Sequence, residues 1–167
     1  MAGTPIGKVC GIDVHHTASP RATTTYETIR REHVDVQGWA DVGYHYLILG
    51  DGSLKVCRPA HLQGAGALGH NRGVLHVAMA GNFEIEAPTQ QQIHTLQQLL
   101  AVLCKRHNLP ETAIIGHCDV YRTIVKFVRV RGRWVSTATA CPGRNLYRLL
   151  GVCREFVRGY LTAKKGS

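Results

Sequence analysis

The sequence predicts an α/β fold: a single domain in which a central mixed β-sheet is flanked by helices. Three observations predict it. Short apolar runs with strand character alternate with longer segments of helical spacing, the 167 residues suit one globular domain, and no repeat or low-complexity linker divides the chain. We therefore expect one domain over residues 1–167, with its core at about 9–162.

The first segments predict a strand followed by a helix. Val9 to Val14 is a short apolar run that leads into His15, as a buried strand does. Thr23 to Val36 carries helical punctuation, with Thr24 as the expected cap and Glu27 three places on.

A hairpin and a third strand follow. Tyr44 to Leu49 and Leu54 to Cys57 flank Gly50-Asp51-Gly52-Ser53, whose glycines are expected to supply the positive backbone angles of a tight turn. Val74 to Met79 is another apolar run, closed by Gly81-Asn82. These segments predict neighbouring strands of the sheet.

The second half predicts two long helices and a short strand. Thr89 to His107 places apolar side chains at helical intervals: Ile93, Leu96, Leu99, Leu100 and Leu103. Ile114 to Gly116 predicts a short buried strand that delivers His117 at its end, and Leu146 to Leu161 returns to helical spacing.

Between these elements lies a basic segment with period-two alternation. In Ile124 to Val135, Val128 and Val130 fall on one face and Arg129 and Arg131 on the other. We expect an inserted β-hairpin over about 122–136 that turns near Gly132.

Charge and composition narrow the class of partner. With 20 Lys and Arg against 11 Asp and Glu, the net charge is +9, which favours anionic partners such as bacterial envelope polymers. The sequence has no zinc-finger spacing, basic heptad helix or aromatic-rich stacking segment, so we expect no dedicated nucleic-acid site. It has neither a run of ~20 apolar residues nor a signal-peptide pattern, so we expect a protein that does not span a membrane and stays in the cytoplasm until released. We also expect a monomer. The six cysteines are scattered, and we expect most to be reduced and buried.

Three segments carry metal-binding side chains at expected strand ends or loops. They are His15-His16, His117-Cys118-Asp119 and Cys141. Two imidazoles and one thiolate form a sensible catalytic zinc shell, because three protein ligands leave the fourth tetrahedral position open. Spacing alone does not choose between His15 and His16, and each signal is weak by itself.

Together, five motifs resemble one known family. VHHTAS, GWADVGYHYLILGDG, the stretch Asn71 to Phe83, GHCDV and TACPG follow the order typical of type 2 amidases, which include peptidoglycan recognition proteins and phage amidase-lysozymes. The resemblance covers about Val9 to Leu150. It implies a recognition-protein-like fold and hydrolysis of the bond between N-acetylmuramic acid and L-alanine in peptidoglycan.

The resemblance also implies roles for residues. It selects His15, with His117 and Cys141, as ligands of one zinc ion. Tyr44 matches the family tyrosine whose hydroxyl reaches the metal-bound water, and Thr139 stands where an oxyanion partner is found. No general acid stands out; the candidates are Glu27, Asp119 and His16.

Two departures from the family pattern concern the substrate groove. Many members have a histidine in a Gly-Ala-His segment where this chain has Gly66, and Gly73 to His76 replaces the usual Ser-Ile-Gly. His70 could fill part of the gap, so His16, His70 and Asn71 are candidate substrate-binding residues.

The inserted segment lengthens the spacing between His117 and Cys141 to 23 intervening residues. It is a candidate envelope-binding element through its basic side chains: Arg122, Lys126, Arg129, Arg131 and Arg133. The alternative is a solvated hairpin whose arginines only protect an edge strand.

The expected role is that of a phage endolysin, held in the host cytoplasm until release. The first alternative is a recognition module of the same fold that binds peptidoglycan without cutting it. The second is a cytoplasmic muropeptide-recycling amidase, whose branch completes its zinc shell with aspartate and has glutamate near Ala78. The third is a regulatory protein that inhibits a polymerase.

Overall fold

The computed structural model describes residues 3–124, 127–130 and 132–163 and has the expected α/β class. Its main sheet has the order β3-β2-β4-β1-β5, with these bounds: β1 Gly11–His16, β2 Tyr46–Ile48, β3 Leu54–Val56, β4 Val74–Met79 and β5 Ile114–Gly116. β1 pairs in parallel with β4 and β5, β2 pairs in parallel with β4, and β3 is antiparallel to β2. The sheet is therefore mixed.

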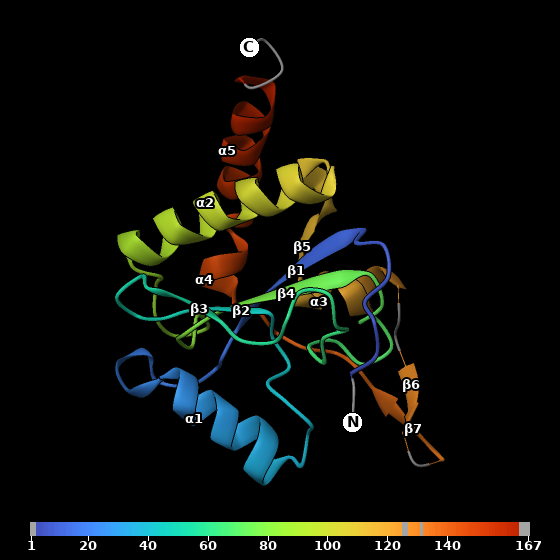
Figure 1. Cartoon of the computed structure of the whole chain (residues 1–167). Coiled ribbons are helices and arrows are strands. Elements are labelled where there is room, and N and C mark those ends of the chain that lie inside the picture. The colour runs from blue at the N-terminus through green and yellow to red at the C-terminus, as the bar shows by residue number, and fades with distance from the viewer. Residues whose placement is uncertain (1–2, 125–126, 131, 164–167) are drawn as a thin grey trace.

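Helices cover both faces of this sheet (Figure 1). α2 (Gln90–His107) and α5 (Leu150–Ala163) pack on one face, where Leu96, Leu100 and Val157 join Ile12 and Val14 in one buried cluster. α1 (Tyr26–Arg30) lies on the other face, with Ile29 against Leu47 and Ala78. Because side chains alternate along a strand, β1 gives its apolar residues to the first face and leaves Asp13 and His15 for the second.

The two predicted helix starts differ in outcome. The predicted helix start at Thr89 is confirmed: Thr89 caps α2, since its hydroxyl accepts from the Gln92 N–H at 3.1 Å. Thr24 was the wrong residue for the first helix: Thr25 is the cap, and Thr24 instead donates its hydroxyl to the Pro20 carbonyl at 2.8 Å. The segment is also divided, because a 3-10 turn η1 (Arg21–Thr23) precedes α1 and a π-helical segment η2 (Arg31–Val36) follows it.

The two glycines of the β2–β3 turn are required for different reasons. Gly52 has a φ of +84°, as expected of a tight turn, whereas Gly50 is not in the left-handed region. A Cβ on Gly50 would lie 2.7 Å from the Arg21 side chain, so this position requires glycine for close packing.

The predicted C-terminal helix is two helices. α4 (Arg144–Tyr147) ends in a tight turn, where the Leu149 N–H bonds the Leu146 carbonyl at 2.9 Å, and α5 begins at Leu150. Leu146 and Leu150 are both buried, so the helical spacing of apolar residues continues across the break.

The remaining elements lie before and after β5 in the chain. β5 runs into the short helix α3 (His117–Asp119) and the segment η4 (Val120–Ile124), while η3 (Glu111–Ala113) precedes β5. The inserted hairpin consists of β6 (Phe127–Val130) and β7 (Arg133–Ser136), with Gly132 at a φ of +82° in the turn (Figure 1). The predicted start at about residue 122 was wrong, because residues 122–124 belong to the helical segment η4. All six cysteines are free, and four are buried; Cys10 is exposed and Cys57 half-buried.

Candidate functional site

The end of β1 separates its two histidines. His15 is buried on the α1 side, and its ring lies 4.4 Å from the His117 ring, centroid to centroid. His16 turns away: its Nδ1 accepts the backbone N–H of Phe83 at 3.1 Å. His16 is thereby held by the main chain and stands outside the group formed by His15.

Cys141 approaches His15 from a distant part of the sequence. Its Sγ lies 3.6 Å from His15 Nδ1 and accepts the backbone N–H of His16 at 3.4 Å. The Cys141 carbonyl accepts the N–H of Cys118, which ties the loop before α4 to the start of α3. The sulfur is thus held by two elements of the fold.

His117 completes a group of three potential metal ligands. Ligand atoms of His15, His117 and Cys141 all lie within 4.8 Å of one another. His117 Nε2 is buried without a hydrogen-bond partner among the described residues. A buried imidazole nitrogen left unpaired is costly, and a bound metal would satisfy it.

The distances and charges fit zinc. Bonds of about 2.0 Å to nitrogen and 2.3 Å to sulfur at a tetrahedral angle put the two atoms about 3.5 Å apart, close to the 3.6 Å observed between His15 and Cys141. Burial lowers the pKa of His117 to about 4 and that of His15 well below its usual value, so both imidazoles are neutral at pH 7. Burial raises the pKa of the Cys141 thiol to about 12, so a metal would have to displace its proton.

Two further predicted residues lie beside this group. The Tyr44 ring is 5.3 Å from the His15 ring and 5.2 Å from that of His33, and burial raises the pKa of its hydroxyl, which therefore stays protonated. Thr139 Oγ1 accepts the N–H of Cys141 at 3.1 Å. This bond orients the Thr139 hydroxyl and leaves its own hydrogen available for donation.

The candidate substrate-binding residues His70 and Asn71 differ in their surroundings. His70 is half-buried, and desolvation lowers its pKa. Asn71 uses its side-chain oxygen to accept the N–H of Ala67 at 2.9 Å, which closes the turn that carries His70. The structure thus gives Asn71 a role in shaping the loop.

None of the three general-acid candidates stands out by its contacts. Glu27 is exposed, and hydrogen bonds from its own backbone N–H and from Thr25 lower its pKa, the opposite of what a proton donor needs. Asp119 accepts from the Gly116 N–H at 3.0 Å and from the Tyr147 hydroxyl at 2.7 Å. His16 is occupied by Phe83.

Sequence reasoning missed a second group on the same face. Asp13 and His76 are opposite each other on β1 and β4, and both are fully buried. Their ligand atoms lie within 4.8 Å of each other and of His15. The available signal was an aspartate inside an apolar run, two residues before His15 and hence on the same strand face.

The basic hairpin is exposed where it is described. Arg129 and Arg133 are solvent-facing, as is Arg122 in the preceding segment η4, while Lys126 and Arg131 lie outside the described residues. Phe127 and Trp134 are 60% and 71% exposed, and Trp134 is the cross-strand partner of Arg129. The hairpin therefore presents large apolar as well as cationic side chains.

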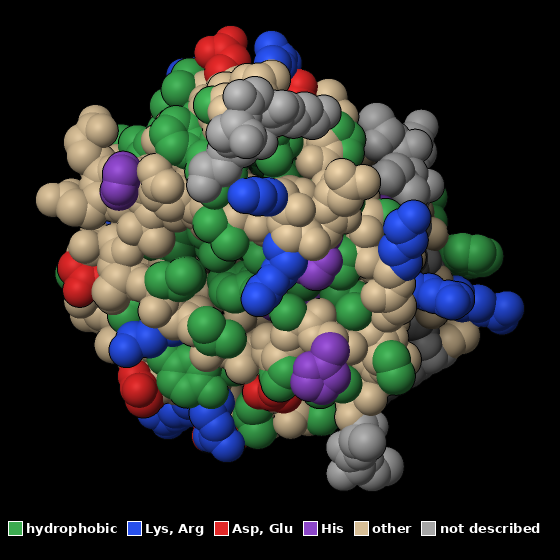
Figure 2. All heavy atoms as spheres, turned by 45° about the horizontal axis from the view of Figure 1, so that its top comes forward, with side chains coloured by type: hydrophobic (Ala, Val, Ile, Leu, Met, Phe, Trp, Pro, Cys, Tyr) green, Lys and Arg blue, Asp and Glu red, His purple; other side chains and the backbone are tan. Residues whose placement is uncertain are grey.

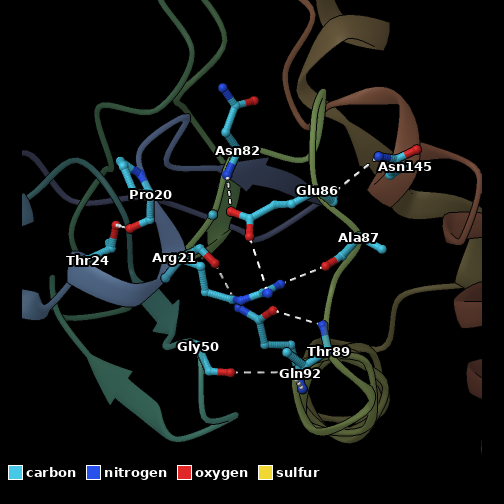
Figure 3. Close-up of polar contacts among 12 residues, drawn as sticks. Pro20, Arg21, Thr24, Gly50, Asn82, Glu86, Ala87, Thr89, Gln92 and Asn145 are labelled. Carbon is cyan, nitrogen blue, oxygen red and sulfur yellow. Dashed lines mark hydrogen bonds and ion pairs between the residues drawn. The ribbon is translucent and has the colours of Figure 1, made fainter.

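A surface depression of about 840 Å³ lies at the carboxyl ends of β1, β2 and β4. It is lined by residues 18–22, 24, 49–51, 82, 85 and 86, and does not contain the three potential ligands. Arg21 crosses it, pairing with Glu86 at 3.3 Å and donating to the Ala87 carbonyl at 2.7 Å (Figure 3). This arginine braces the loop after β1 against the segment that leads to α2.

Comparison with known proteins identifies relatives. Residues 6–144 match the family described as N-acetylmuramoyl-L-alanine amidase. The human protein of that name is 32% identical over 86% of this chain, and the Drosophila melanogaster peptidoglycan-recognition protein SC2 is 30% identical over 80% of it. The chain spans 24% of the human protein and 68% of the fly protein.

Solved structures share the fold. The N-acetylmuramoyl-L-alanine amidase LysC from Clostridium intestinale has a TM-score of 0.73 at 27% identity, covering 91% of this chain and 89% of its own. The bumblebee recognition protein PGRP-SA has a TM-score of 0.72 at 26% identity, covering 90% and 85%. In the described part of the chain, no helix combines the length and apolar character needed to cross a membrane.

Proposed function

The chain belongs to the N-acetylmuramoyl-L-alanine amidase family, and from this premise we propose that it hydrolyses the amide bond between N-acetylmuramic acid and L-alanine in bacterial peptidoglycan. The observation that carries the proposal is the convergence of His15, His117 and Cys141 from three distant segments. We propose that these side chains hold one zinc ion, with the substrate carbonyl entering beside them.

Each protein group has a task in this reaction. When bound, zinc supplies Lewis-acid polarisation of the amide carbonyl and lowers the pKa of water towards ~7. The protonated Tyr44 hydroxyl, packed against His15, orients the attacking water. Thr139, held by the Cys141 N–H, donates its hydrogen to the oxygen on which negative charge develops.

The fold also protects the thiolate that this site requires. The backbone N–H of His16 points at Cys141 Sγ, so it donates to the sulfur and favours the ionised form against the cost of burial. Threonine cannot neutralise an oxyanion as lysine would, so the metal would provide more of the electrostatic stabilisation.

The contacts favour an enzyme over a binding module. A recognition module has no need of a complete ligand set, whereas all three ligand positions are filled and adjacent in this chain. The recycling branch is disfavoured because Cys141 stands in place of aspartate, and because Ala78, beside His15 in the sheet, stands in place of glutamate.

We further propose that the enzyme is an endolysin that reaches the wall after release from the host cytoplasm. Its fold is shared with the Ph2119 endolysin, at a TM-score of 0.69 and 25% identity. The exposed cationic and aromatic hairpin would then bind anionic polymers of the envelope.

Two cysteine variants test the metal site. Cys141→Ala should lose zinc and amidase activity, because the site cannot be completed by two imidazoles alone. Cys118→Ala is the matched control: Cys118 is also a buried free thiol, but it lies outside the ligand group. Zinc content measured by mass spectrometry should fall only in Cys141→Ala. Full zinc and turnover in that variant, with both lost in Cys118→Ala, would contradict the ligand set.

A further inference from the structure

His76 lies directly behind the candidate zinc ligand His15. Its Nδ1 is 3.0 Å from His15 Nε2, and both rings are buried. We propose that His76 is a positioning residue that accepts the Nε2–H of His15 and so leaves His15 Nδ1 to hold the metal. This inference rests on the zinc site proposed above and assigns a role to a residue at which the chain departs from the family pattern.

The direction of this hydrogen bond follows from the chemistry of imidazole. A neutral histidine has one N–H and one lone pair. His15 Nδ1 is the nitrogen that faces Cys141 Sγ, at 3.6 Å, so a metal between them requires the Nδ1 lone pair. The His15 hydrogen is then on Nε2, and only a lone pair on His76 Nδ1 can receive it.

Neighbouring groups hold His76 in this orientation. The His45 ring stacks on it, with centroids 5.8 Å apart and planes 11° from parallel. His45 is itself oriented, because its Nδ1 accepts the His76 backbone N–H and its Nε2 donates to the Leu62 carbonyl, each at 2.9 Å. His45 therefore packs against His76 without competing for His15.

The loop opposite is shaped around the same ring. A Cβ on Gly66 would lie 2.6 Å from His76 Nδ1 and 3.2 Å from His15 Nε2, and one on Gly64 would lie 2.5 Å from His76 Cδ2. The loop can carry no side chains at either position while His76 is there. The His76 ring thus occupies the space that a side chain at position 66 would need.

Asp13 is close to the pair but does not join it. Its Oδ2 is 3.9 Å from His76 Nδ1, too far for a hydrogen bond, and neither of its oxygens has a hydrogen-bond partner among the described residues. A metal between Asp13, His76 and His15 would need the His15 Nε2 lone pair. A neutral His15 cannot offer that lone pair while Nδ1 holds zinc, so a second metal there would require His15 to lose its Nε2 hydrogen and bind both ions.

The test compares zinc affinities of the folded chain by competition with a chelating dye. His76→Leu has similar volume without an acceptor, whereas His76→Asn places an oxygen on Cγ where Nδ1 was. We expect His76→Leu to bind zinc about 10- to 100-fold more weakly, as loss of a partner behind a metal-bound histidine does, and His76→Asn to recover most of that loss. Gly66→Ala should also weaken binding, because the new methyl group displaces an unchanged His76.

Circular dichroism of the metal-free variants separates binding from folding, and nitrogen-15 spectra report which His15 nitrogen carries hydrogen. An Nε2–H signal on zinc-loaded His15, with the affinity order above, is the expected result. Equal affinity in wild type, His76→Leu and His76→Asn would overturn the inference and leave the zinc site standing. Two zinc ions per wild-type chain would overturn it in favour of a metal on Nε2, and a wild-type chain without zinc affinity would overturn the site and the inference together.

Discussion

Burial sets the protonation state of each residue around His15. Removal from water disfavours charge, so it keeps the imidazoles of His15 and His117 neutral, the Tyr44 hydroxyl protonated and the Cys141 thiol difficult to ionise. The neutral imidazoles can bind a metal, and the protonated Tyr44 hydroxyl can donate a hydrogen bond. The raised pKa of the Cys141 thiol opposes metal binding, and the hydrogen bond from the His16 N–H to the sulfur partly offsets this effect.

At this scale, the two hydroxyl groups beside the ligands are expected to act in the transition state. Tyr44→Phe and Thr139→Ala should keep zinc and fold but lower turnover about a hundredfold each, since one such donor contributes ~3 kcal/mol. Steady-state kinetics on a soluble muropeptide, with zinc content determined in parallel, measures this. Wild-type turnover in either variant would reduce that residue to a packing role.

Asp13 should make stability fall as pH rises. Burial raises the pKa of its carboxyl from 3.8 to about 8, so the folded chain retains a proton that the unfolded chain releases. The contribution of Asp13 to the free energy of unfolding is fully present below about pH 4 and is lost progressively towards pH 8. Asp13→Asn should therefore gain stability relative to wild type across this range, as measured by urea unfolding of the metal-free protein.

The exposed Asp35 supplies the control for that experiment. Asp35→Asn makes the same substitution at a surface carboxyl that lies 3.9 Å from Arg30 Nη1, so it should not reproduce the gain in stability expected of Asp13→Asn. If Asp13→Asn and wild type gave parallel profiles from pH 4 to pH 8, the unpartnered carboxyl would have no influence on folding.

At the scale of elements, the sequence predicted those helix and strand bounds that depend on neighbouring residues alone. The helix predicted from Thr89 to His107 is α2, which Thr89 and Gln92 begin with a capping box, and Val74–Met79 is a strand with its predicted bounds. Three successive threonines before α1 could not be ranked, because the Thr24 hydroxyl is taken by a loop carbonyl that only the folded chain brings near.

The same limit applies to the candidate site. The motifs identified His15, His117 and Cys141, and the fold brings these residues together. Asp13 and His76 could not be paired in advance, since their proximity depends on the register between β1 and β4. The need for glycine at position 66 follows only from the His76 ring that fills the adjacent space.

The β6–β7 hairpin should act as an electrostatic contact with the envelope. Changing Arg129, Arg131 and Arg133 to serine should weaken binding to whole walls and flatten the salt dependence of lysis, because exposed charges are screened beyond ~8 Å at physiological ionic strength. Hydrolysis of a small soluble muropeptide should stay nearly unchanged. Cosedimentation and lysis at several salt concentrations measure both effects.

A variant with Arg31, Lys105 and Arg106 changed to serine removes the same charge from exposed positions on other elements. It should bind walls better than the hairpin variant. Equal losses on walls and on soluble substrate in the hairpin variant would instead show that the hairpin shapes the groove, and no loss on either would leave it as a solvated insertion.

The whole molecule combines a buried neutral centre with a basic surface. Its net charge is +9, and Figure 2 shows Lys and Arg side chains spread over the visible face without forming one continuous stripe. Such a distribution gives long-range attraction to an extended anionic polymer rather than a shaped site for one ligand. We therefore expect specificity for the amide bond to come from the residues around His15, His117 and Cys141.

The central claim is that this chain cuts the bond between sugar and peptide. The direct measurement is product analysis of purified cell walls digested by the zinc-loaded protein, with Cys141→Ala as the inactive control. We expect new alanine amino groups in step with clearing and no new reducing sugar ends. Reducing ends that appear with clearing would contradict the amidase assignment, and intact walls with zinc bound would show a recognition module in place of an enzyme.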